Sequence, residues 1–448
     1  MAKYQAYAEY KDSGVGFLGE IPEHWIVSKV KYLAPFQVGW TPPTKNDSNF
    51  IGDNLWVNIS DLKGKVINNT VKQISDKAAL EASMDITPKG SLMYSFKLSV
   101  GAVSFAGCDM YTNEAIASFL HSAKLPLSYL YYALPKFVIE NASTNIYGAN
   151  ILNQELIRNA LLVEIPYIEA EKIANFLDHE TAKIDHLIEK QQQLIELLKE
   201  KRQAVISHAV TKGLDPNVPM KDSGVEWLGE VPEHWEVSKF GYISQVVRGG
   251  SPRPAGDPTL FNGDYSPWVT VAEITKDDEL YLTSTETFLT KKGSEQCRVF
   301  KAGTLLLSNS GATLGVPKIL CIDANANDGV VGFEQLQIDI EFAYYYLSIL
   351  TNDLRERVKQ GSGQPNLNTD IVKNISIAIP PLSEIQLIVT EIKGQVEKFV
   401  SLIQKAERQI LLMQERRTAL ISAAVTGKID VRNWQVPTLA EADMEFSA

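Results

Sequence analysis

Arginine, asparagine and serine gather in two glycine-rich stretches in the second half of the chain. The stretches read RGGSPR over residues 248–253 and NSGAT over residues 309–313. Arginine and asparagine can form bidentate hydrogen bonds with guanine and adenine respectively, so the stretches could read DNA base edges. The alternative is that both are plain hairpin turns in which glycine serves only the backbone geometry. The candidates for DNA contacts are Arg248, Ser251, Arg253, Asn309 and Ser310, together with Lys97 and Lys318 from stretches that we consider related.

Two histidines lie in the near-identical stretches GEIPEHW (19–25) and GEVPEHW (229–235). A metal or catalytic role is one interpretation, but neither His24 nor His234 has a second ligand within sequence reach. We instead predict a structural clasp, in which the proline fixes a turn and the tryptophan is buried against a helical frame. The three cysteines show no CxxC spacing, which argues against structural zinc and a disulfide framework.

Recognisable catalytic motifs are missing from the sequence. There is no GxxxxGK[ST] loop, no Asn-Pro-Pro-aromatic tetrapeptide, no glycine-rich cofactor fingerprint and no Ser/His/Asp arrangement. The triplet Glu391-Ile392-Lys393 resembles part of a nuclease motif, but it falls within a predicted helix. We therefore expect a non-catalytic chain that binds neither a metal nor a cofactor by itself.

The elements that position these residues are duplicated. Residues 11–29 return at 221–239, a shift of 210, with 15 of 19 positions identical. A second repeat aligns residues 152–215 with 367–430 without a gap, at a shift of 215. The segments between these repeats diverge. The sequence therefore predicts two large modules that share a common frame, each of which can recognise a different target.

Each half ends in a long helical segment. Residues 168–212 lack glycine and proline and are rich in Leu, Ile, Glu, Lys and Gln. Apolar positions recur at 3–4 spacing in both halves, which predicts that the two helices pair as an antiparallel coiled coil. The alternative is that each helix packs only on its own module. The predicted interface positions are Ile184, Ile188, Ile195, Leu198, Arg202, Val205, Phe399, Ile403, Ile410, Met413, Arg417 and Leu420, with Gln191 and Ala406 in the same registers.

The fold class that follows is α+β. Two pseudo-symmetric mixed α/β modules are joined by the two long helices, and residues 92–95 and 305–308 are predicted strands. The predicted segments are an N-terminal conserved segment (1–34), the first module (35–150), helical region 1 (151–220), a repeated linker segment (221–244), the second module (245–365), helical region 2 (366–432) and a flexible acidic tail (433–448).

Charge and hydropathy limit the possible partners. The net charge is −11, and the first module is balanced, with nine Lys or Arg against nine Asp or Glu. Such a chain cannot bind DNA mainly by coating phosphates with its own cations, so a partner would have to supply that surface. No signal peptide and no apolar run of about 20 residues is present, which predicts a soluble cytoplasmic protein with no membrane partner.

The whole pattern resembles the specificity subunit of a Type I restriction-modification system. The resemblance rests on the paired GEIPEHW and GEVPEHW segments, on GSGQPNLNTDIVKNISIAIPPLSE (361–384), and on the helical ends KEKRQAVISHAVTKGLD and QERRTALISAAVTGKID. It implies that two target recognition domains each read one half of a bipartite DNA sequence. It also implies that an antiparallel coiled coil sets the spacer and docks two modification (methyltransferase) subunits.

The resemblance extends to cofactors and further partners. It implies S-adenosylmethionine, ATP and magnesium on partner subunits, adenine methylation by the modification subunits, and restriction subunits that translocate and cleave double-stranded DNA. It adds Gln364 to the expected DNA contacts. The first half departs from the pattern, because TNIYG (144–148) replaces the GSGQ stretch, so this contact does not transfer to the first module. A DNA-free scaffold that pairs two copies of another protein is the rival hypothesis, and a lone nuclease is a weaker one.

Overall fold

The computed structural model describes residues 4–97, 99–144, 150–359 and 366–435. The chain divides into two compact units. The first unit comprises Met1–Lys190 and Gln409–Ala448, and the second comprises Gln191–Arg408. Each unit therefore contains one module and a segment of each long helix. The predicted acidic tail lies mostly outside the described residues.

The two long helices are α5 (Tyr167–Lys212) and α11 (Leu382–Val425). The prediction of a long helix up to Lys212 is confirmed. Helix α5 ends where Gly213 adopts a positive φ of 79°, a backbone conformation that glycine takes without steric cost. Both helices begin directly after a proline, at Pro166 and Pro381, as the N-terminal preference of proline leads one to expect.

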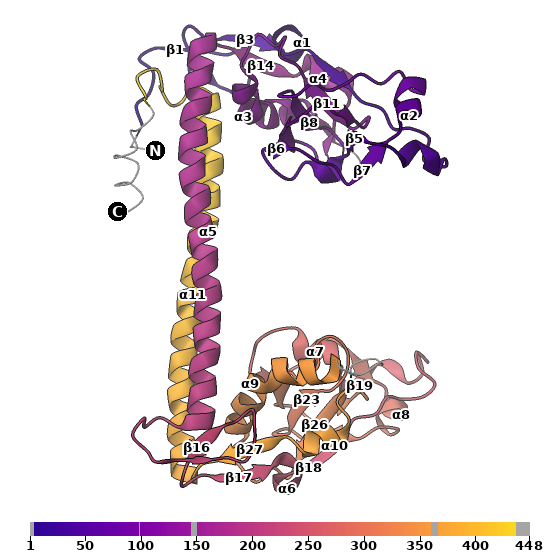
Figure 1. Cartoon of the computed structure of the whole chain (residues 1–448), viewed down its shortest axis with the longest axis vertical. Helices are drawn as coiled ribbons and strands as arrows, with labels where there is room; N and C mark the ends of the chain where they lie inside the picture. Colours follow the sequence, from indigo (N-terminus) through magenta and orange to yellow (C-terminus); the bar gives the residue numbers. More distant parts are fainter. Residues whose placement is uncertain (1–3, 98, 145–149, 360–365, 436–448) are drawn as a thin grey trace. The chain divides into compact units, whose positions relative to one another are not determined.

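The helices pair in opposite directions within each unit (Figure 1). In the first unit, Arg417 of α11 donates to Asp185 of α5 at 2.8 Å, while Lys172 near the start of α5 meets the Arg432 carbonyl beyond the end of α11. In the second unit, a Cβ placed on Gly213 at the end of α5 would lie 3.0 Å from Glu384 at the start of α11. The antiparallel coiled coil that the sequence predicts is confirmed, and neither helix packs on its own module alone.

The predicted interface positions lie on the less exposed faces of the two helices. Six are buried, namely Ile184, Ile195, Phe399, Ile403, Ala406 and Leu420. The other eight are half-buried: Ile188, Gln191, Leu198, Arg202, Val205, Ile410, Met413 and Arg417. The two arginines find different partners, because Arg417 pairs with Asp185 of the facing helix and Arg202 lies 3.9 Å from Asp278 of the second module.

The first module is built on two small sheets. The larger has the order β4-β11-β8-β9-β6, and the smaller has the order β10-β5-β7. Helix α3 (Leu127–Val138) belongs to the same hydrophobic core as α5 and the larger sheet. The strands are β4 (Phe36–Val38), β5 (Asn54–Val57), β6 (Val66–Ile67), β7 (Lys72–Ile74), β8 (Leu92–Ser95), β9 (Val103–Ala106), β10 (Tyr111–Thr112) and β11 (Ile116–Phe119). The short helical elements are η1 (Asp47–Phe50), η2 (Ile59–Asp61), α2 (Asp76–Glu81) and η3 (Ile139–Asn141).

The second module repeats this order. Its five-stranded sheet reads β18-β26-β23-β24-β20, and a four-stranded sheet reads β21-β19-β25-β22. The strands are β18 (Gln245–Arg248), β19 (Phe261–Val269), β20 (Tyr281–Leu282), β21 (Phe288–Leu289), β22 (Val299–Phe300), β23 (Leu305–Ser308), β24 (Pro317–Leu320), β25 (Ala324–Ala326) and β26 (Val330–Glu334). The helices are α7 (Val271–Thr275), α8 (Lys291–Ser294) and α9 (Ile340–Lys359). The predicted strands 92–95 and 305–308 are confirmed as β8 and β23, both fully buried.

Short frame elements join each module to the helices. They are β1 (Tyr10–Asp12), β2 (Glu20–Pro22), β3 (Ile26–Lys29), α1 (Val30–Leu33), β12 (Ser143–Thr144), β13 (Asn150–Ile151), α4 (Gln154–Asn159) and β14 (Leu161–Glu164) in the first unit. In the second unit they are β15 (Met220–Asp222), β16 (Glu230–Pro232), β17 (Glu236–Lys239), α6 (Phe240–Ile243), α10 (Thr369–Lys373) and β27 (Ser376–Ile379). Strands β3 and β14 pair in the first unit as β17 and β27 do in the second. Among the helices within the described ranges, none is long and apolar enough to cross a membrane.

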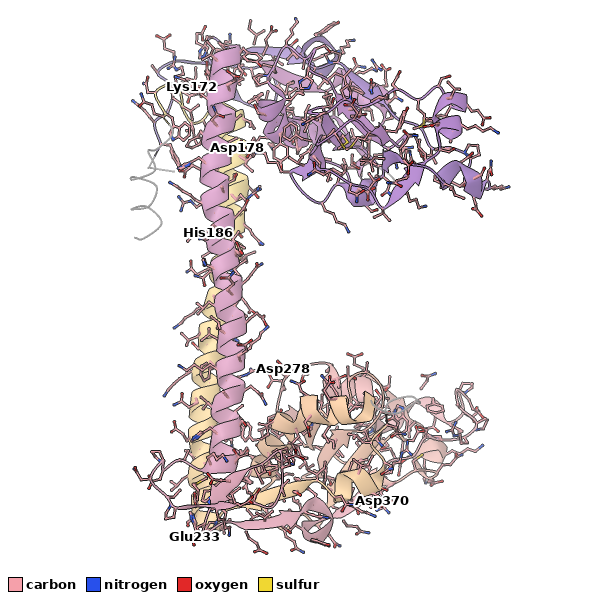
Figure 2. All side chains as sticks on the ribbon, viewed as in Figure 1. Lys172, Asp178, His186, Glu233, Asp278 and Asp370 are labelled. Carbon is pink, nitrogen blue, oxygen red and sulfur yellow. The ribbon has the colours of Figure 1, made fainter. Side chains whose placement is uncertain are left out.

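Side-chain contacts hold the first module against the helices. Asp178 of α5, labelled in Figure 2, accepts hydrogen bonds from Lys65 at 2.6 Å and from the Tyr132 hydroxyl at 2.5 Å. These contacts join α3 and the loop residue before β6 to the helix, and the shared apolar core of the unit reinforces them. The orientation of the module on its own helix pair is therefore fixed by charged groups as well as by packing.

The repeated GEIPEHW and GEVPEHW segments form the predicted clasps. Trp25 and Trp235 are fully buried, and each indole nitrogen donates to a glutamate in the first turn of a long helix. Glu169 of α5 accepts from Trp25 at 3.0 Å, from Tyr7 at 2.7 Å, and contacts His24 at 2.8 Å. Each histidine therefore contacts a glutamate carboxylate of a long helix, which confirms the predicted clasp.

The second clasp is smaller. Glu384 of α11 contacts His234 at 2.8 Å and accepts from Trp235 at 3.2 Å, and its side chain is 26% exposed against 6% for Glu169. Tyr7 has no aromatic counterpart there, because Asn217 stands in the aligned position, whereas Tyr7 belongs to the N-terminal stretch. That stretch pairs with the C-terminal end, where the Asp430 amide donates to the Gln5 carbonyl at 2.8 Å.

This difference predicts unequal effects of removing the two carboxylates. Glu169→Ala leaves the buried donors of Tyr7 and Trp25 unpaired, and we expect it to lower the free energy of unfolding of the first unit by about 3–5 kcal/mol. Glu384→Ala, the matched variant, should cost the second unit about 1–2 kcal/mol, because it leaves only one buried donor, Trp235, unpaired, while solvent reaches His234. Urea denaturation followed by tryptophan fluorescence measures both. Equal losses in the two variants would contradict the clasp assignment.

Candidate nucleic-acid interface

In the second module, three candidate residues converge on one acidic residue. Arg248 Nε donates to the backbone carbonyl of Asp328 at 2.7 Å, and Ser251 Oγ donates to the Asp328 carboxylate at 2.6 Å. Arg253 Nη2 lies 3.9 Å from the other carboxylate oxygen. The hydrogen bond from Ser251 is the main cause that lowers the pKa of Asp328, so the carboxylate stays ionised beside the two arginines. We call these four residues the Asp328 cluster.

Backbone geometry brings the two segments of this cluster together. Strand β18 ends at Arg248, and a Cβ on the following Gly249 would lie only 2.4 Å from the Ala326 carbonyl oxygen. Only glycine permits this approach of the 249–253 loop to the turn at 327–329. The turn is closed by Asn327, whose side-chain oxygen accepts from the Gly329 amide at 3.1 Å.

The first module has the same arrangement with different cations. Thr41 donates its hydroxyl to the carboxylate of Glu114, and Lys97 Nζ lies 3.9 Å from Glu114. Gly39 packs against the Thr112 backbone as Gly249 packs against Ala326, since a Cβ there would overlap the Thr112 carbonyl. Thr41, Lys97 and Glu114 form the Glu114 cluster.

Strand register establishes that the two clusters are equivalent. Val38 pairs with Ala117 in the first module, and Arg248 pairs with Val331 in the second. Leu92 pairs with Phe119 where Leu305 pairs with Phe333. This alignment matches Thr41 with Ser251 and Glu114 with Asp328, but Lys97 with Ser310. The hydroxyl and the carboxylate belong to the common frame, whereas the cations enter from different strands.

The remaining candidates are placed differently. Asn309 is fully buried and donates to the Leu367 carbonyl at 3.1 Å, while Ser310 is half-buried and forms a β-bridge with Asn366. Lys97, Arg248 and Arg253 are exposed. Gln364 lies outside the described residues, as do residues 145–148 of the divergent stretch in the first half.

Lys318 does not reach the surface. Its side chain is 1% exposed, and its ammonium is paired with the carboxylate of Asp277 and bonded to the Asp277 carbonyl at 3.1 Å. The hydrogen bond from Lys318 is the leading cause that lowers the pKa of Asp277. Ser104 occupies the equivalent position and donates to the Gly64 carbonyl at 2.6 Å. Both side chains therefore fix the loop that follows a short helix, η2 in the first module and α7 in the second. Lys97 and Lys318 therefore do not occupy equivalent positions, contrary to the expectation from the sequence. Lys318 and Asn309 are both buried, so neither is retained as a candidate DNA contact.

Sequence reasoning missed the acidic members of both clusters and Thr41. A signal was present, because Gly-Trp-Thr-Pro at 39–42 returns as Gly-Gly-Ser-Pro at 249–252 with the same shift of 210 residues as the first repeat. The triplets Asn113-Glu114-Ala115 and Asn327-Asp328-Gly329 also stand out in otherwise divergent segments. Their spatial contact with the glycine loops could not be read from the chain.

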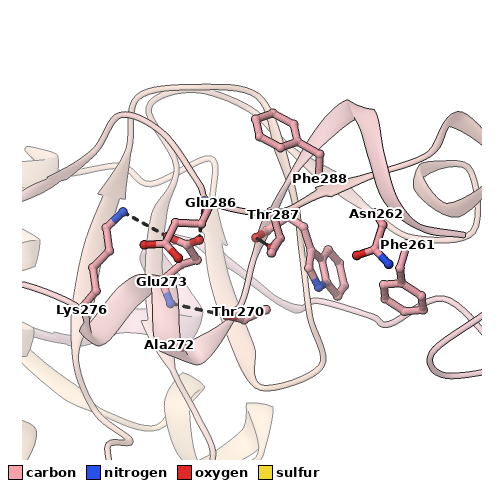
Figure 3. A pocket seen from close by; sticks show the side chains of 10 residues that line it. Phe261, Asn262, Thr270, Ala272, Glu273, Lys276, Glu286, Thr287 and Phe288 are labelled. Carbon is pink, nitrogen blue, oxygen red and sulfur yellow. Dashed lines mark hydrogen bonds and ion pairs between the residues drawn. The ribbon is translucent and has the colours of Figure 1, made fainter. Parts of the chain in front are cut away.

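A pocket of about 440 Å³ lies elsewhere on the second module, between β19, β21 and α7. Phe261 lies on one side of it (Figure 3) and forms an edge-to-face pair with Trp268, a mostly buried residue of the pocket lining. On the other side, Glu273 accepts from Lys276 at 3.1 Å and from the Glu286 amide at 2.7 Å. These bonds satisfy the Glu273 carboxylate. Its role is therefore to hold the backbone at Glu286 against α7 rather than to bind a ligand.

The long helices expose leucines at repeated positions. Leu187 and Leu402 are separated by the 215 residues of the second repeat, and so are Leu197 and Leu412. All four are exposed, by 51%, 46%, 62% and 41% respectively. In the first unit, Leu187 and Leu412 each lie within about two helical turns of the Asp185–Arg417 ion pair, so both mark nearly the same level of the helix pair. Leu197 and Leu402 are their counterparts in the second unit.

Within the described part of the chain, no group of three or more His, Cys, Asp or Glu side chains is placed to hold a metal ion. The side chains that converge are instead hydroxyls, cations and single carboxylates. Such groups bind and orient polar partners through hydrogen bonds and charge. The two clusters thus bring such groups together in a repeated backbone frame.

Comparison with known proteins agrees with this organisation. The model of the Type I restriction modification DNA specificity domain matches the chain twice, over residues 22–197 and 232–412. The MjaIX Type I restriction enzyme specificity subunit of Methanocaldococcus jannaschii is 25% identical over 445 residues, covering 96% of this chain and 99% of that protein. The MjaVIII specificity subunit of the same organism is 21% identical over 436 residues, covering 92% and 95%.

Solved structures share the fold. A chain from a structure of complex assembly and conformational transition in the type I R-M system aligns with a TM-score of 0.71 at 14% identity, covering 91% of this chain and 99% of that one. The HsdS subunit from Thermoanaerobacter tengcongensis aligns with a TM-score of 0.52 at 14% identity, covering 91% and 98%. Two tandem modules on paired helices, together with two matches to the specificity domain, define the class. The chain belongs to the specificity subunits of Type I restriction-modification systems.

Proposed function

We propose that this chain is the non-catalytic DNA-reading subunit of a Type I methyltransferase and restriction complex. In this proposal each module reads one half of a bipartite double-stranded DNA target, and the helical regions dock two modification subunits. The observation that carries the proposal is the pair of equivalent clusters. A common frame places a hydroxyl–carboxylate bond in both modules, while the exposed cations differ, Lys97 in one and two arginines in the other.

Different cations in one frame suit two half-sites of different sequence. Specificity in DNA recognition comes from base-edge contacts, whereas contacts with phosphates mainly supply affinity. Arg248 and Arg253 belong to the second module, and neither has a cationic counterpart at the aligned positions Val38 and Pro43. The same backbone would therefore present different donors to each half of the target.

The repeated leucines support the docking of two identical partners. A partner that contacts one copy of a duplicated surface can contact the other in the same way, because the exposed groups recur in equivalent places. Leu187 and Leu412 in the first unit, and Leu197 and Leu402 in the second, are exposed apolar side chains at such equivalent places. Exposed apolar patches mark protein interaction sites when several such groups lie together, and this is the role that we assign to these leucines.

Partner subunits would supply the chemistry and much of the phosphate contact. The modification subunits would bind S-adenosylmethionine and methylate adenine, and the restriction subunits would use ATP and magnesium. A methylation assay with candidate modification subunits tests the proposal. Sequence-specific methylation that requires this chain supports it, and methylation of the same sequence without the chain contradicts it. If the chain were instead an adaptor that does not bind DNA, the methylated sequence would not depend on the chain.

The negative charge of the chain predicts how DNA affinity is divided. At 150 mM salt we expect the purified chain to bind its target at least about 100-fold more weakly than the complex with the modification subunits, because the chain cannot neutralise many phosphates. Fluorescence anisotropy with a labelled target duplex measures both. The control is a duplex with both half-sites scrambled. Tight and selective binding by the chain alone would contradict this division.

A further inference from the structure

The guanidinium of Arg248 is anchored through its inner nitrogen. Nε donates to the Asp328 carbonyl at 2.7 Å, and within the described ranges no group bonds to Nη1 or Nη2. The side chain is exposed at the end of β18. A guanidinium fixed in this way presents its two outer nitrogens as a planar fork, the shape that matches O6 and N7 of guanine.

The anchor itself is rigid. Ser251 Oγ and the Asp328 carboxylate, 2.6 Å apart, tie the loop after Arg248 to the turn that carries the accepting carbonyl. The Gly329 amide bonded to Asn327 closes the same turn. A side chain that is already held loses less conformational freedom when it binds, so more of its contact energy appears as discrimination between bases.

Comparison with the first module separates the anchor from the reader. Thr41 and Glu114 repeat the tie between loop and turn, but Val38 stands in the aligned position of Arg248. The tie is therefore a shared device, and the arginine is the part that is particular to one module. This is the pattern expected of a specificity-determining residue in a common scaffold.

We propose that Arg248 reads a guanine in the half-site of the second module through Nη1 and Nη2, and that Asp328 and Ser251 are positioning residues that aim it. The inference rests on the proposed function and deepens it. It names the base class and the residue, and it assigns the equivalent tie in the first module, Thr41 to Glu114, to the other half-site.

The test uses the complete methyltransferase complex on unmethylated bacterial genomic DNA, with methylated motifs determined by single-molecule sequencing. Arg248→Lys keeps the charge but removes the planar fork. We expect the preference for guanine at one position of one half-site to fall by about tenfold or more, while the other half-site is unchanged. Retained guanine preference in Arg248→Lys, or a wild-type motif without guanine in that half-site, overturns the proposal.

Arg298 supplies the matched control. It is an exposed arginine of the same module, and it forms an ion pair with Glu334 at 3.0 Å. Glu334 lies at one end of β26, whereas Val331, the strand partner of Arg248, lies near the other end. Arg298→Lys should leave the methylated motif unaltered. Relaxation of the same guanine position by Arg298→Lys would show that the effect is not specific to the fork, and this too overturns the proposal.

The positioning role is tested separately at Ser251. Ser251→Ala removes the tie and should relax the guanine position about threefold, whereas Ser251→Thr, which copies Thr41, should preserve it. Thr41→Ala should act only on the other half-site. Relaxation by Ser251→Thr equal to that by Ser251→Ala would remove the positioning role. Failure of the wild-type complex to methylate a bipartite motif would instead refute the proposed function, so the two failures are distinguishable.

Discussion

Exchange of residues 245–365 for the equivalent segment of a relative with a different target should replace one half of the methylated sequence and leave the other half intact. The expected effect is complete, because every cation of the Asp328 cluster lies within the exchanged segment and the Glu114 cluster lies outside it. Single-molecule sequencing of DNA methylated by the chimeric complex provides the readout.

The packing of the second unit sets a condition for this exchange. Its main core joins module residues such as Leu305 and Phe342 to helix residues such as Ile206 and Ile388. A donor segment must keep apolar groups of similar volume at the contacting positions, since core mismatches cost about 1–3 kcal/mol each. Thermal unfolding of the chimera therefore serves as the control for intact packing.

The reciprocal exchange of residues 35–150 completes the experiment. It should replace the half of the motif that the first chimera leaves intact. An unaltered motif in a folded and active chimera, or simultaneous change of both halves, would contradict the assignment of one module to one half-site. The two exchanges also assign each cluster to its half-site. The variants of Arg248 and Thr41 then identify the single base pairs that each cluster recognises.

The sequence predicted the frame well because its signals are local or repeated. The lack of glycine and proline in α5 and the 3–4 spacing of apolar residues reflect the helix period itself. The clasps were predicted from the repeat of a proline and a tryptophan, but the accepting glutamates were not. Glu169 and Glu384 lie 144 and 149 residues from their tryptophans, and no local pattern indicates such a contact.

The candidate site was predicted only in part, because burial depends on tertiary register. Lys318 resembled a surface cation, yet every residue of β24 is buried, and Lys318 lies in the interior with Asp277 as its partner. Asn309 follows the buried strand β23, and its side chain donates a hydrogen bond to the Leu367 carbonyl. Asp328 was not a candidate, since an acidic side chain argues against a phosphate contact, and its value as an anchor appears only when the β18 loop is placed against it.

Charge placed on the repeated leucines should remove the modification subunits one at a time. Leu197→Glu with Leu402→Glu alters the second unit, and Leu187→Glu with Leu412→Glu alters the first. Burial of a leucine contributes about 1.5–3 kcal/mol, and a glutamate in its place adds a desolvation penalty. Each double variant should therefore weaken docking at its own unit by about 1,000-fold or more, and the quadruple variant should bind no modification subunit.

Light scattering coupled to size-exclusion chromatography measures the number of modification subunits bound. Wild-type chain should bind two, each double variant one and the quadruple variant none. The free chain should stay folded, because all four leucines are exposed and glutamate favours helix. Leu80→Glu, which changes an 81% exposed leucine of α2 in the first module, is the matched control and should bind two. Two bound subunits in both double variants would place the docking surface elsewhere. Loss of both subunits in either double variant would mean that the partners bind as a unit rather than to independent, equivalent sites.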